Sequence, residues 1–417
     1  MKRYETYKDS GIQWVGEIPS HWEIVKLRYT GTFENGLTYS TGDIVEDDGI
    51  LVLRSSNIQN EHITFDDCVY VNSVPKELMV SKGDIIICSR NGSAALIGKC
   101  AIIEDDVKAS FGAFMMRYRA NINNKFAFYL FLSAVANYRG LFSTSTINQL
   151  TMSIINQMQV ALPSDTEQKN IATYLDHKVG QIDVAIAEKE QMLEDLKNYR
   201  SAIISEAVTK GLDTNVEIRD SGIDKFPMIR SNWNTSKLKY IASIRSGSAL
   251  PINNIKKDAL YEVYGGNGCM GRADEYNTES PAIIIGRVGA LCGNVHLIKT
   301  KKWVTDNALI LNIKRDVTYE YLYYYLTAYD LNTLNSSNAQ PLITGTKVLD
   351  VVTPMPSLNE QILIANYLDD KTSMIDETID QITVQIVELK SYKSSLITEA
   401  VTGKIDLRDW KPQEEKV

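Results

Sequence analysis

Two glycine-rich stretches of this 417-residue chain imitate nucleotide-binding loops, so they are the first places to look for chemistry. Residues 266–271 have the GxGxxG spacing of a dinucleotide site. Such a site needs a helix to follow, however, and the polar segment ADEYNTESP follows instead. Residues 92–99 imitate a phosphate-binding loop with a spacing one residue too long, and Cys100 stands where Ser or Thr would bind magnesium. We therefore reject both matches.

Metal-dependent chemistry and methyl transfer also lack their residue patterns. The five cysteines form no CxxC pair and the four histidines are scattered, so we predict no metal site. The DxK spacings of a nuclease half-site at 176–178 and 369–371 fall in predicted helices, where charged residues are expected on a solvated face. No two prolines are adjacent, so the Asn/Asp-Pro-Pro-aromatic signature of amino-methyltransferases is missing. We predict a chain with no catalytic residues and no cofactor of its own.

Polar loops are better candidates, and the chemistry they suit is DNA recognition. They are rich in Gly, Ser, Asn, Gln and Arg, which contact base edges and phosphates but are also ordinary turn residues. Arg90 and Arg287 each follow a matched strand-like run, IIIC or AIII, and arginine is the most frequent reader of guanine. The predicted DNA-binding residues are Arg54, Ser55, Asn57, Ser89, Arg90, Asn91, Asn148, Arg245, Asn267, Arg287, Asn338 and Lys347.

The composition is that of an ordinary globular protein, with 44% hydrophobic and 23% charged residues. No apolar run reaches 18 residues, and the start MKRYETYKDSG lacks the apolar core of a signal peptide, so we expect a cytoplasmic protein. The net charge of −8 opposes contact with phosphates. Either basic groups concentrate on one face, or a partner supplies positive charge.

An internal repeat determines which elements must position these loops. Residues 162–213 return as residues 355–406 without a gap, and each copy has apolar residues at alternating steps of three and four. This pattern predicts two helices of about 45 residues that pair antiparallel as a coiled coil, with the basic seam residues Arg200 and Lys393 fixing the register. The predicted pairing residues are Ile182, Ile186, Leu193, Leu196, Ile203, Ile375, Ile379, Ile386, Leu389 and Leu396.

A second repeat, DSGI at 9–12 and 220–223, makes the chain two copies of one plan. Each copy has a lead-in, a globular domain with strand-like runs first and a helix late, and a long helix. We predict an α+β fold with two mixed domains joined by two long antiparallel coiled-coil helices, in a pseudo-two-fold repeat. The predicted segments are 1–161, 162–213, 214–354 and 355–417.

The repeated text PSxxEQxxIAxYLDxK, which ends in LKxYxSxxIxEAVTxxxD, closely resembles the specificity (S) subunit of type I restriction–modification enzymes. The resemblance implies a non-catalytic subunit for phage defence, in which two target recognition domains read the halves of a split double-stranded DNA target. It implies that the helices space the domains and recruit two methyltransferase subunits, which use S-adenosylmethionine. Restriction/translocase subunits, which need ATP and magnesium, join through these.

Two other functions stay open at this stage. The chain could be the specificity chain of a related restriction enzyme, whose partner fuses methylation and cleavage in one polypeptide. It could also be a coiled-coil interaction scaffold without a role on DNA, which predicts no salt-dependent binding to duplex. A self-sufficient nuclease or methyltransferase is excluded by the missing motifs.

Overall fold

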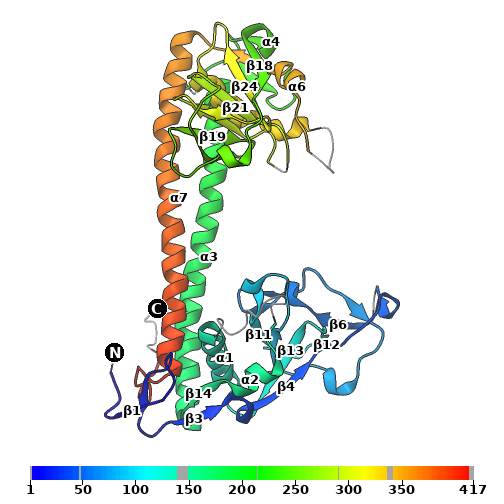
Figure 1. Ribbon diagram of the computed structural model, residues 1–417, viewed down its shortest axis with the longest axis vertical. Helices are drawn as coiled ribbons and strands as arrows, with labels where there is room; N and C mark the ends of the chain where they lie inside the picture. Colours follow the sequence, from blue (N-terminus) through cyan, green and yellow to red (C-terminus); the bar gives the residue numbers. More distant parts are fainter. Residues whose placement is uncertain are drawn as a thin grey trace. The chain divides into compact units, whose positions relative to one another are not determined.

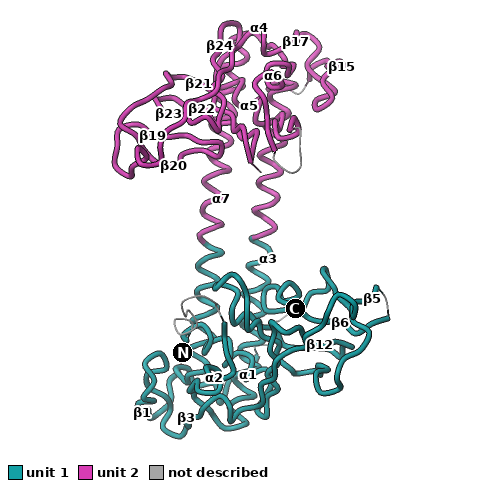
Figure 2. Tube along the Cα trace, turned by 45° about the vertical axis from the view of Figure 1, so that its right-hand side comes forward, with its two compact units in different colours: residues 1–189, 385–417 teal, residues 190–384 magenta. Residues whose placement is uncertain are grey.

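The computed structural model describes residues 2–46, 48–138, 149–213, 215–289, 291–335 and 341–412. The chain divides into two compact units, shown in Figure 2. Unit 1 comprises residues 1–189 and 385–417, and unit 2 comprises residues 190–384. Each unit contains one α+β domain and part of both long helices (Figure 2).

The two long helices are α3 (Asp165–Lys210), with 46 residues, and α7 (Leu358–Val401), with 44 (Figure 1). Each begins with the same capping box. The Ser164 hydroxyl donates to Glu167 at 2.7 Å, and Ser357 and Glu360 repeat the contact at 3.0 Å. These side chains bind backbone amides that a helix start leaves unpaired, so the motif fixes where both helices begin.

Within each unit the two helices pack antiparallel. In unit 1 Asp183 binds Lys393 at 2.8 Å and Lys189 binds Gln385 at 2.7 Å. In unit 2 Arg200 binds Asp376 at 2.8 Å. Of the predicted pairing residues, Ile182, Ile186, Ile203, Ile375, Ile386 and Leu396 are buried, and Leu193, Leu196, Ile379 and Leu389 are half-buried. The predicted fold class, with α+β domains and two paired long helices, is confirmed.

The domain of unit 1 is built on two four-stranded sheets. The first has the order β11-β10-β13-β4, with bounds Cys100–Ile102, Ile85–Cys88, Met115–Ala120 and Gly31–Asn35. The second has the order β12-β6-β9-β5, with bounds Ala109–Phe111, Ile50–Leu53, Tyr70–Val71 and Ile44–Val45. A small hairpin, β7 (Ile58–Gln59) and β8 (His62–Ile63), extends from it. Helix α1 (Asn124–Tyr138) packs on β11 and β13, and its apolar run FAFYLFLSAV is almost entirely buried because it lies between sheet and long helix.

The domain of unit 2 repeats the strand order of the first sheet with a different sequence, and its second sheet has one strand fewer. Its four-stranded sheet has the order β18-β24-β21-β22, with bounds Ala242–Ser246, Ala308–Ile313, Ala282–Gly286 and Val295–Ile298. Its second sheet is β20-β19-β23, with bounds Gly268–Ala273, Tyr261–Gly265 and Trp303–Val304. The parallel pair β19/β23 matches the parallel pair β6/β12 of unit 1. The strands are followed by helix α5 (Tyr319–Tyr329), the counterpart of α1.

Short paired strands join each domain to its long helix. They are β1/β2 (Tyr7–Asp9, Glu17–Pro19) and β3/β14 (Glu23–Lys26, Gln159–Leu162) in unit 1, and β15/β16 (Ile218–Asp220, Met228–Arg230) and β17/β25 (Asn234–Lys237, Val352–Met355) in unit 2. Short helices lie beside them: α2 (Met152–Gln157), α4 (Leu238–Ile241) and α6 (Gly345–Leu349).

The contacts of the repeated Glu-Gln pair explain why the sequence at the start of α3 occurs again at the start of α7. Buried Glu167 accepts hydrogen bonds from the Trp22 indole and from His21, both at 3.0 Å. Burial opposes the carboxylate charge, but these donors and Ser164 outweigh it and lower the pKa of Glu167. The buried Gln168 amide binds the chain just before α1, accepting from the Asn123 amide at 3.1 Å.

Unit 2 repeats both contacts. Gln361 accepts from the Thr318 amide at 2.7 Å, and the Trp233 indole donates to Glu360 at 3.5 Å. A matched tyrosine adds a third contact, because Tyr129 donates to Asp176 at 2.8 Å and Tyr324 donates to Asp369 at 2.6 Å. The repeated residues therefore attach each domain to its long helix.

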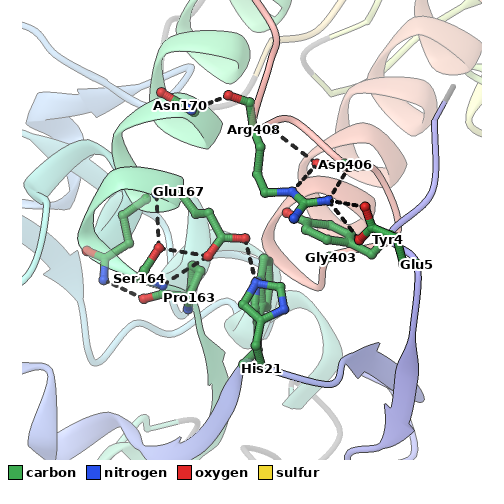
Figure 3. A network of polar contacts seen from close by, with 12 residues as sticks. Tyr4, Glu5, His21, Pro163, Ser164, Glu167, Asn170, Gly403, Asp406 and Arg408 are labelled. Atoms are coloured by element: carbon green, nitrogen blue, oxygen red, sulfur yellow. Dashed lines mark hydrogen bonds and ion pairs between the residues drawn. The ribbon is translucent and has the colours of Figure 1, made fainter.

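The two ends of the chain meet in unit 1 (Figure 3). The Asp406 amide donates to the Lys2 carbonyl at 2.9 Å, and the Arg408 guanidinium binds both Asp406 and Glu5. The bond from Arg408 lowers the pKa of Asp406 to about 2. The N-terminal strands β1 and β2 thus lie against the end of α7. Their counterparts in unit 2 are β15 and β16, which follow the end of α3 in the chain.

Candidate nucleic-acid interface

In unit 1, the loops that follow β6 and β10 meet beside one end of the sheets. The Asn91 amide donates to the Ser55 hydroxyl at 3.3 Å, and the Lys99 ammonium donates to the Ser55 carbonyl at 3.3 Å. A shallow groove of about 540 Å³ lies there, lined by Ser55, Ser56, Gln59, Asn60, Leu96 and Lys99. Hydroxyl, amide and ammonium groups around an open groove can donate to and accept from a polyanionic ligand.

Arg90 and Phe114 form an exposed pair next to this groove. The Arg90 guanidinium lies over the Phe114 ring, 5.5 Å from its centroid, and Phe114 is 60% exposed. The backbone amides of Ser89 and Arg90 both donate to the Phe114 carbonyl, at 3.0 and 3.1 Å. Buried Ser89 adds its hydroxyl to the same carbonyl at 3.0 Å, so it fixes the pair rather than facing solvent.

Arg54 and Asn57 shape the loop after β6. Asn57 is fully buried, accepts from the Arg54 amide at 2.9 Å, and donates to the carbonyls of Thr64 and Asp67. Its side chain is therefore engaged within the loop. Arg54 is half-buried and pairs with Asp67 at 2.8 Å, which offsets part of its charge.

In unit 2, Arg287 connects the loops that follow β18 and β21. Its guanidinium donates to the Ser246 hydroxyl at 3.4 Å, and its amide donates to the Asn307 carbonyl at 2.9 Å. The Arg287 carbonyl accepts from the Ile343 amide at 2.9 Å. Its Nε atom is buried and has no hydrogen-bond partner among the described residues. Arg287 is half-buried, so it is more constrained than its counterpart Arg90.

The remaining predicted residues of unit 2 are spread over a strand, a turn and a short helix. Arg245 is exposed and donates to the Asn277 carbonyl at 2.7 Å, while exposed Asn267 accepts from Asn294 at 3.0 Å. Lys347 is half-buried in α6 and donates to the Leu334 carbonyl at 2.8 Å. Two predicted residues, Asn148 and Asn338, lie outside the described residues.

Sequence reasoning missed Phe114, Lys99 and Asn294. Phe114 lies in the apolar run FGAFMM, which predicts a buried strand, and only the fold exposes its ring. Lys99 lies in the stretch that imitates a phosphate-binding loop. The rejection of that match concerned nucleotide binding, not contact with DNA. Asn294 directly precedes β22, and its pairing with Asn267 depends on the hairpin β19/β20.

The cysteines and acids of the described residues show no sign of a reactive centre. Burial raises the pKa of the Cys88 and Cys100 thiols, which are therefore not nucleophiles at neutral pH. All five cysteines are free. No cluster of three or more His, Cys, Asp or Glu side chains in the described part of the chain could hold a metal ion. Residues 266–271 form the two-residue turn after β19 and the first part of β20, not a helix start.

Among the described residues, no helix combines the length and the apolar character needed to cross a membrane.

Comparisons with known proteins agree on one family. The model of the type I restriction modification DNA specificity domain matches residues 19–194 and 230–388, well over half of the chain. This chain belongs to that family. The specificity subunit of the type I enzyme StySPI from Salmonella potsdam is 24% identical over 426 residues, covering 94% of this chain and 90% of that subunit. The EcoKI specificity subunit of Escherichia coli (strain K12) is also 24% identical, with the same two coverages.

A solved structure shares the fold. A chain from work on "complex assembly and conformational transition of the type I R-M system" superposes with a TM-score of 0.68 at 15% identity, over 93% of this chain and 99% of that one. The resemblance seen in the repeats is thus confirmed. Type I specificity subunits are the non-catalytic components of their complexes.

Proposed function

We propose that this specificity subunit reads a bipartite DNA target, with one half-site for each α+β domain. The observation that carries the proposal is that both domains use the same order of strands in their first sheet but have different loops. In unit 1 the loops after β6 and β10 offer Arg90, Phe114 and the groove beside Ser55. In unit 2 the matching loops offer Asn267 and Arg287, and strand β18 adds Arg245 near its end. Different side chains on one frame suit two different base sequences.

The predicted residues have unequal roles in this proposal. Exposed Arg90, Arg245 and Asn267 contact bases or phosphates directly, as does the half-buried Asn91. Asn57 and Ser89 are buried and bonded internally, so they position the loops for contact. Arg54, Ser55 and Lys347 have an intermediate role. Each is bonded within the protein, but part of its surface is exposed to solvent.

We further propose that two methyltransferase subunits bind the long helices and that restriction/translocase subunits join through them. S-adenosylmethionine, ATP and magnesium would act in those partners. A partner with a basic DNA-binding surface also answers the charge problem, since this chain carries −8 and must approach phosphates.

Replacement of one domain tests the proposal. A chimera in which residues 30–161 come from another specificity subunit, assembled with the methyltransferase, should methylate a target with one altered half-site and one unchanged half-site. Sequencing of methylated adenines provides the measurement, and the reciprocal replacement of residues 241–353 is the matched control. A chimera that alters both half-sites would count against independent reading. Loss of all methylation, despite normal assembly, would favour the scaffold function.

A further inference from the structure

In unit 1 the C-terminal tail covers the first turns of α3. Trp410 packs edge-on against Tyr174, with ring centroids 5.1 Å apart. The Arg408 carbonyl accepts from the Asn170 amide at 2.9 Å, and the Arg408 guanidinium binds Asp406 (Figure 3). Because the tail lies over it, Tyr174 is only 4% exposed.

In unit 2 the segment equivalent to the tail has Asn215 and Glu217 where the tail has Arg408 and Trp410, so the same surface has no arginine and no tryptophan of this chain on it. The 193-residue offset pairs the three residues that bind the tail with three residues of unit 2, as Asn170/Leu363, Tyr174/Tyr367 and Asp406/Asp213. Tyr367 and Asp213 line a groove of about 300 Å³, together with Ile203, Leu212, Val216 and Ile218. The place taken by the tail in unit 1 is therefore a groove in unit 2.

The unit 2 surface is also more apolar than its counterpart. Leu212 is 44% exposed, whereas its counterpart Ile405 is 4% exposed. Ile218 is 45% exposed, and Leu363, one helical turn before Tyr367 on the same face, is 60% exposed. Exposed apolar side chains around a groove are typical of an interaction site.

The groove has one acidic group, Asp213, that matches a basic ligand. In unit 1 Asp406 is neutralised by Arg408, the residue that follows two positions later. In unit 2 the counterpart Asp213 accepts a hydrogen bond from the Asn215 amide and has no cationic partner among the described residues. Glu206 also lines the groove, but it pairs at 3.4 Å with half-buried Lys210, another lining residue, so Asp213 is the carboxylate left for a cation.

We propose that the groove of unit 2 binds an extended segment of a partner protein, which supplies an arginine and, two residues later, an aromatic side chain. The arginine pairs with Asp213 and the ring packs on Tyr367, as Arg408 and Trp410 do in unit 1. The tail of this chain is already bound in unit 1, so a different protein provides the segment. The proposal deepens the proposed function, because a partner subunit of the complex would be that protein.

A peptide with the sequence of residues 407–412, LRDWKP, is the probe. Labelled with fluorescein and titrated with the full chain, it should show saturable binding by fluorescence anisotropy. The peptide with alanine in place of tryptophan should bind at least about tenfold more weakly, because it loses the buried ring. The variants Leu363→Glu and Tyr367→Ala should weaken binding of LRDWKP similarly.

Val384→Glu is the matched control, because Val384 is 56% exposed on the same helix and does not line the groove. It should bind the peptide like the parent chain. Leu363→Glu changes an exposed residue, so a normal circular dichroism spectrum should accompany its loss of binding. Absent binding to the parent chain, or equal binding to Leu363→Glu, would overturn the proposal.

Two further results distinguish this proposal from binding of a second copy and from the proposed reading of DNA. If the chain self-associates in sedimentation experiments and deletion of residues 407–417 abolishes this, a second copy fills the groove and the partner assignment is wrong. The titration contains neither DNA nor methyltransferase. Failure of the proposed DNA reading therefore leaves the peptide result standing, and the reverse also holds.

Discussion

Lys393 of α7 binds Asp183 of α3 at 2.8 Å, and it also binds Glu61 of the first domain at 2.6 Å. Glu61 reaches this position from the two-residue turn of the hairpin β7/β8, where its φ of 68° and that of Asn60, 47°, suit a type I′ turn. The repeat places Arg200 and Asp376 at the equivalent positions in unit 2, where the described residues of the domain add no third ion-pair partner. One seam cation therefore joins the helices and the first domain together.

Removing the Lys393 charge should destabilise unit 1. Lys393→Ala leaves Asp183 and Glu61 without their cation, so we expect the free energy of unfolding to fall by about 2–4 kcal/mol. Urea denaturation followed by circular dichroism measures the change. Lys189→Ala, which removes an exposed bond to Gln385, is the control and should cost less than about 0.5 kcal/mol. Similar values for the two variants would contradict a structural role for Lys393.

The same residue gives a pH dependence with a definite sign. Burial lowers the pKa of Lys393, but Glu61 and Asp183 outweigh it and raise the pKa above its usual value. A raised folded-state pKa means that the stabilisation is complete below the unfolded value of about 10.4 and is lost as the pH rises through the folded value. The stability difference between the parent chain and Lys393→Ala should thus shrink at strongly alkaline pH. A difference that is constant from pH 8 to pH 11 would refute this.

Arg90 should determine part of one half-site. Arg90→Ala removes an exposed guanidinium, so it should weaken DNA binding of the assembled complex by about 1–3 kcal/mol and relax one base position. Arg28→Ala is a close control, since Arg28 lies over exposed Tyr29 at 4.7 Å in the same type of pair but away from these loops. Binding assays on a target library should show relaxed preference for Arg90→Ala alone. An unchanged preference in a folded complex would exclude base contact.

The helices should set the distance between half-sites. Seven residues inserted in both helices, after Lys189 and after Val384, keep the heptad pattern and the partners on each side. Seven residues span about 10.5 Å, so the gap in the methylated target should grow by about three base pairs. The same insertion in α3 alone shifts one helix against the other and should prevent assembly. Methylation of the original target by the double insertion would show that the helices do not set the gap.

The contact between the chain ends should make unit 1 sensitive to acid. The pKa of Asp406 is lowered to about 2, so its contribution is present above the unfolded value of about 3.9 and is lost as the pH falls through the folded value. Arg408→Ala should lower the free energy of unfolding by about 1–3 kcal/mol, because buried Asp406 loses its main donor. It should also move acid unfolding to higher pH. Lys411→Ala, in the same tail, should do neither.

The helical part of the fold was predictable because its signals are local. Apolar spacing and the Pro-Ser starts predicted helices of about 45 residues, and the structure has 46 and 44. The seam cations Arg200 and Lys393 were recognisable from the heptad alone, whereas their partners Asp376 and Asp183 depend on the register between helices. The sheet order was not predictable, since β12 and β6 pair in parallel although 55 residues separate their ends.

The interface was only partly predictable for a related reason. Arginine and asparagine in polar loops are visible in any sequence, but their exposure depends on contacts between distant loops. By residue type, Asn57 and Arg90 were equally good candidates for contact with DNA, yet Asn57 is fully buried and Arg90 is exposed. The position of Phe114 depends on the Ser89 and Arg90 amides, and no local pattern of sequence predicts that.

The equivalence of the two seam ion pairs has a consequence for α3 by itself. Asp183 and Arg200 both lie on α3. In the repeat, Asp183 is equivalent to Asp376 of α7 and Arg200 is equivalent to Lys393 of α7. Two copies of α3 that run antiparallel can therefore form both ion pairs with each other, through an isologous contact. The first half of the chain thus contains both members of this self-complementary ion pair. A homodimer of that half would present one recognition domain twice, so its cognate sequence would be a palindrome.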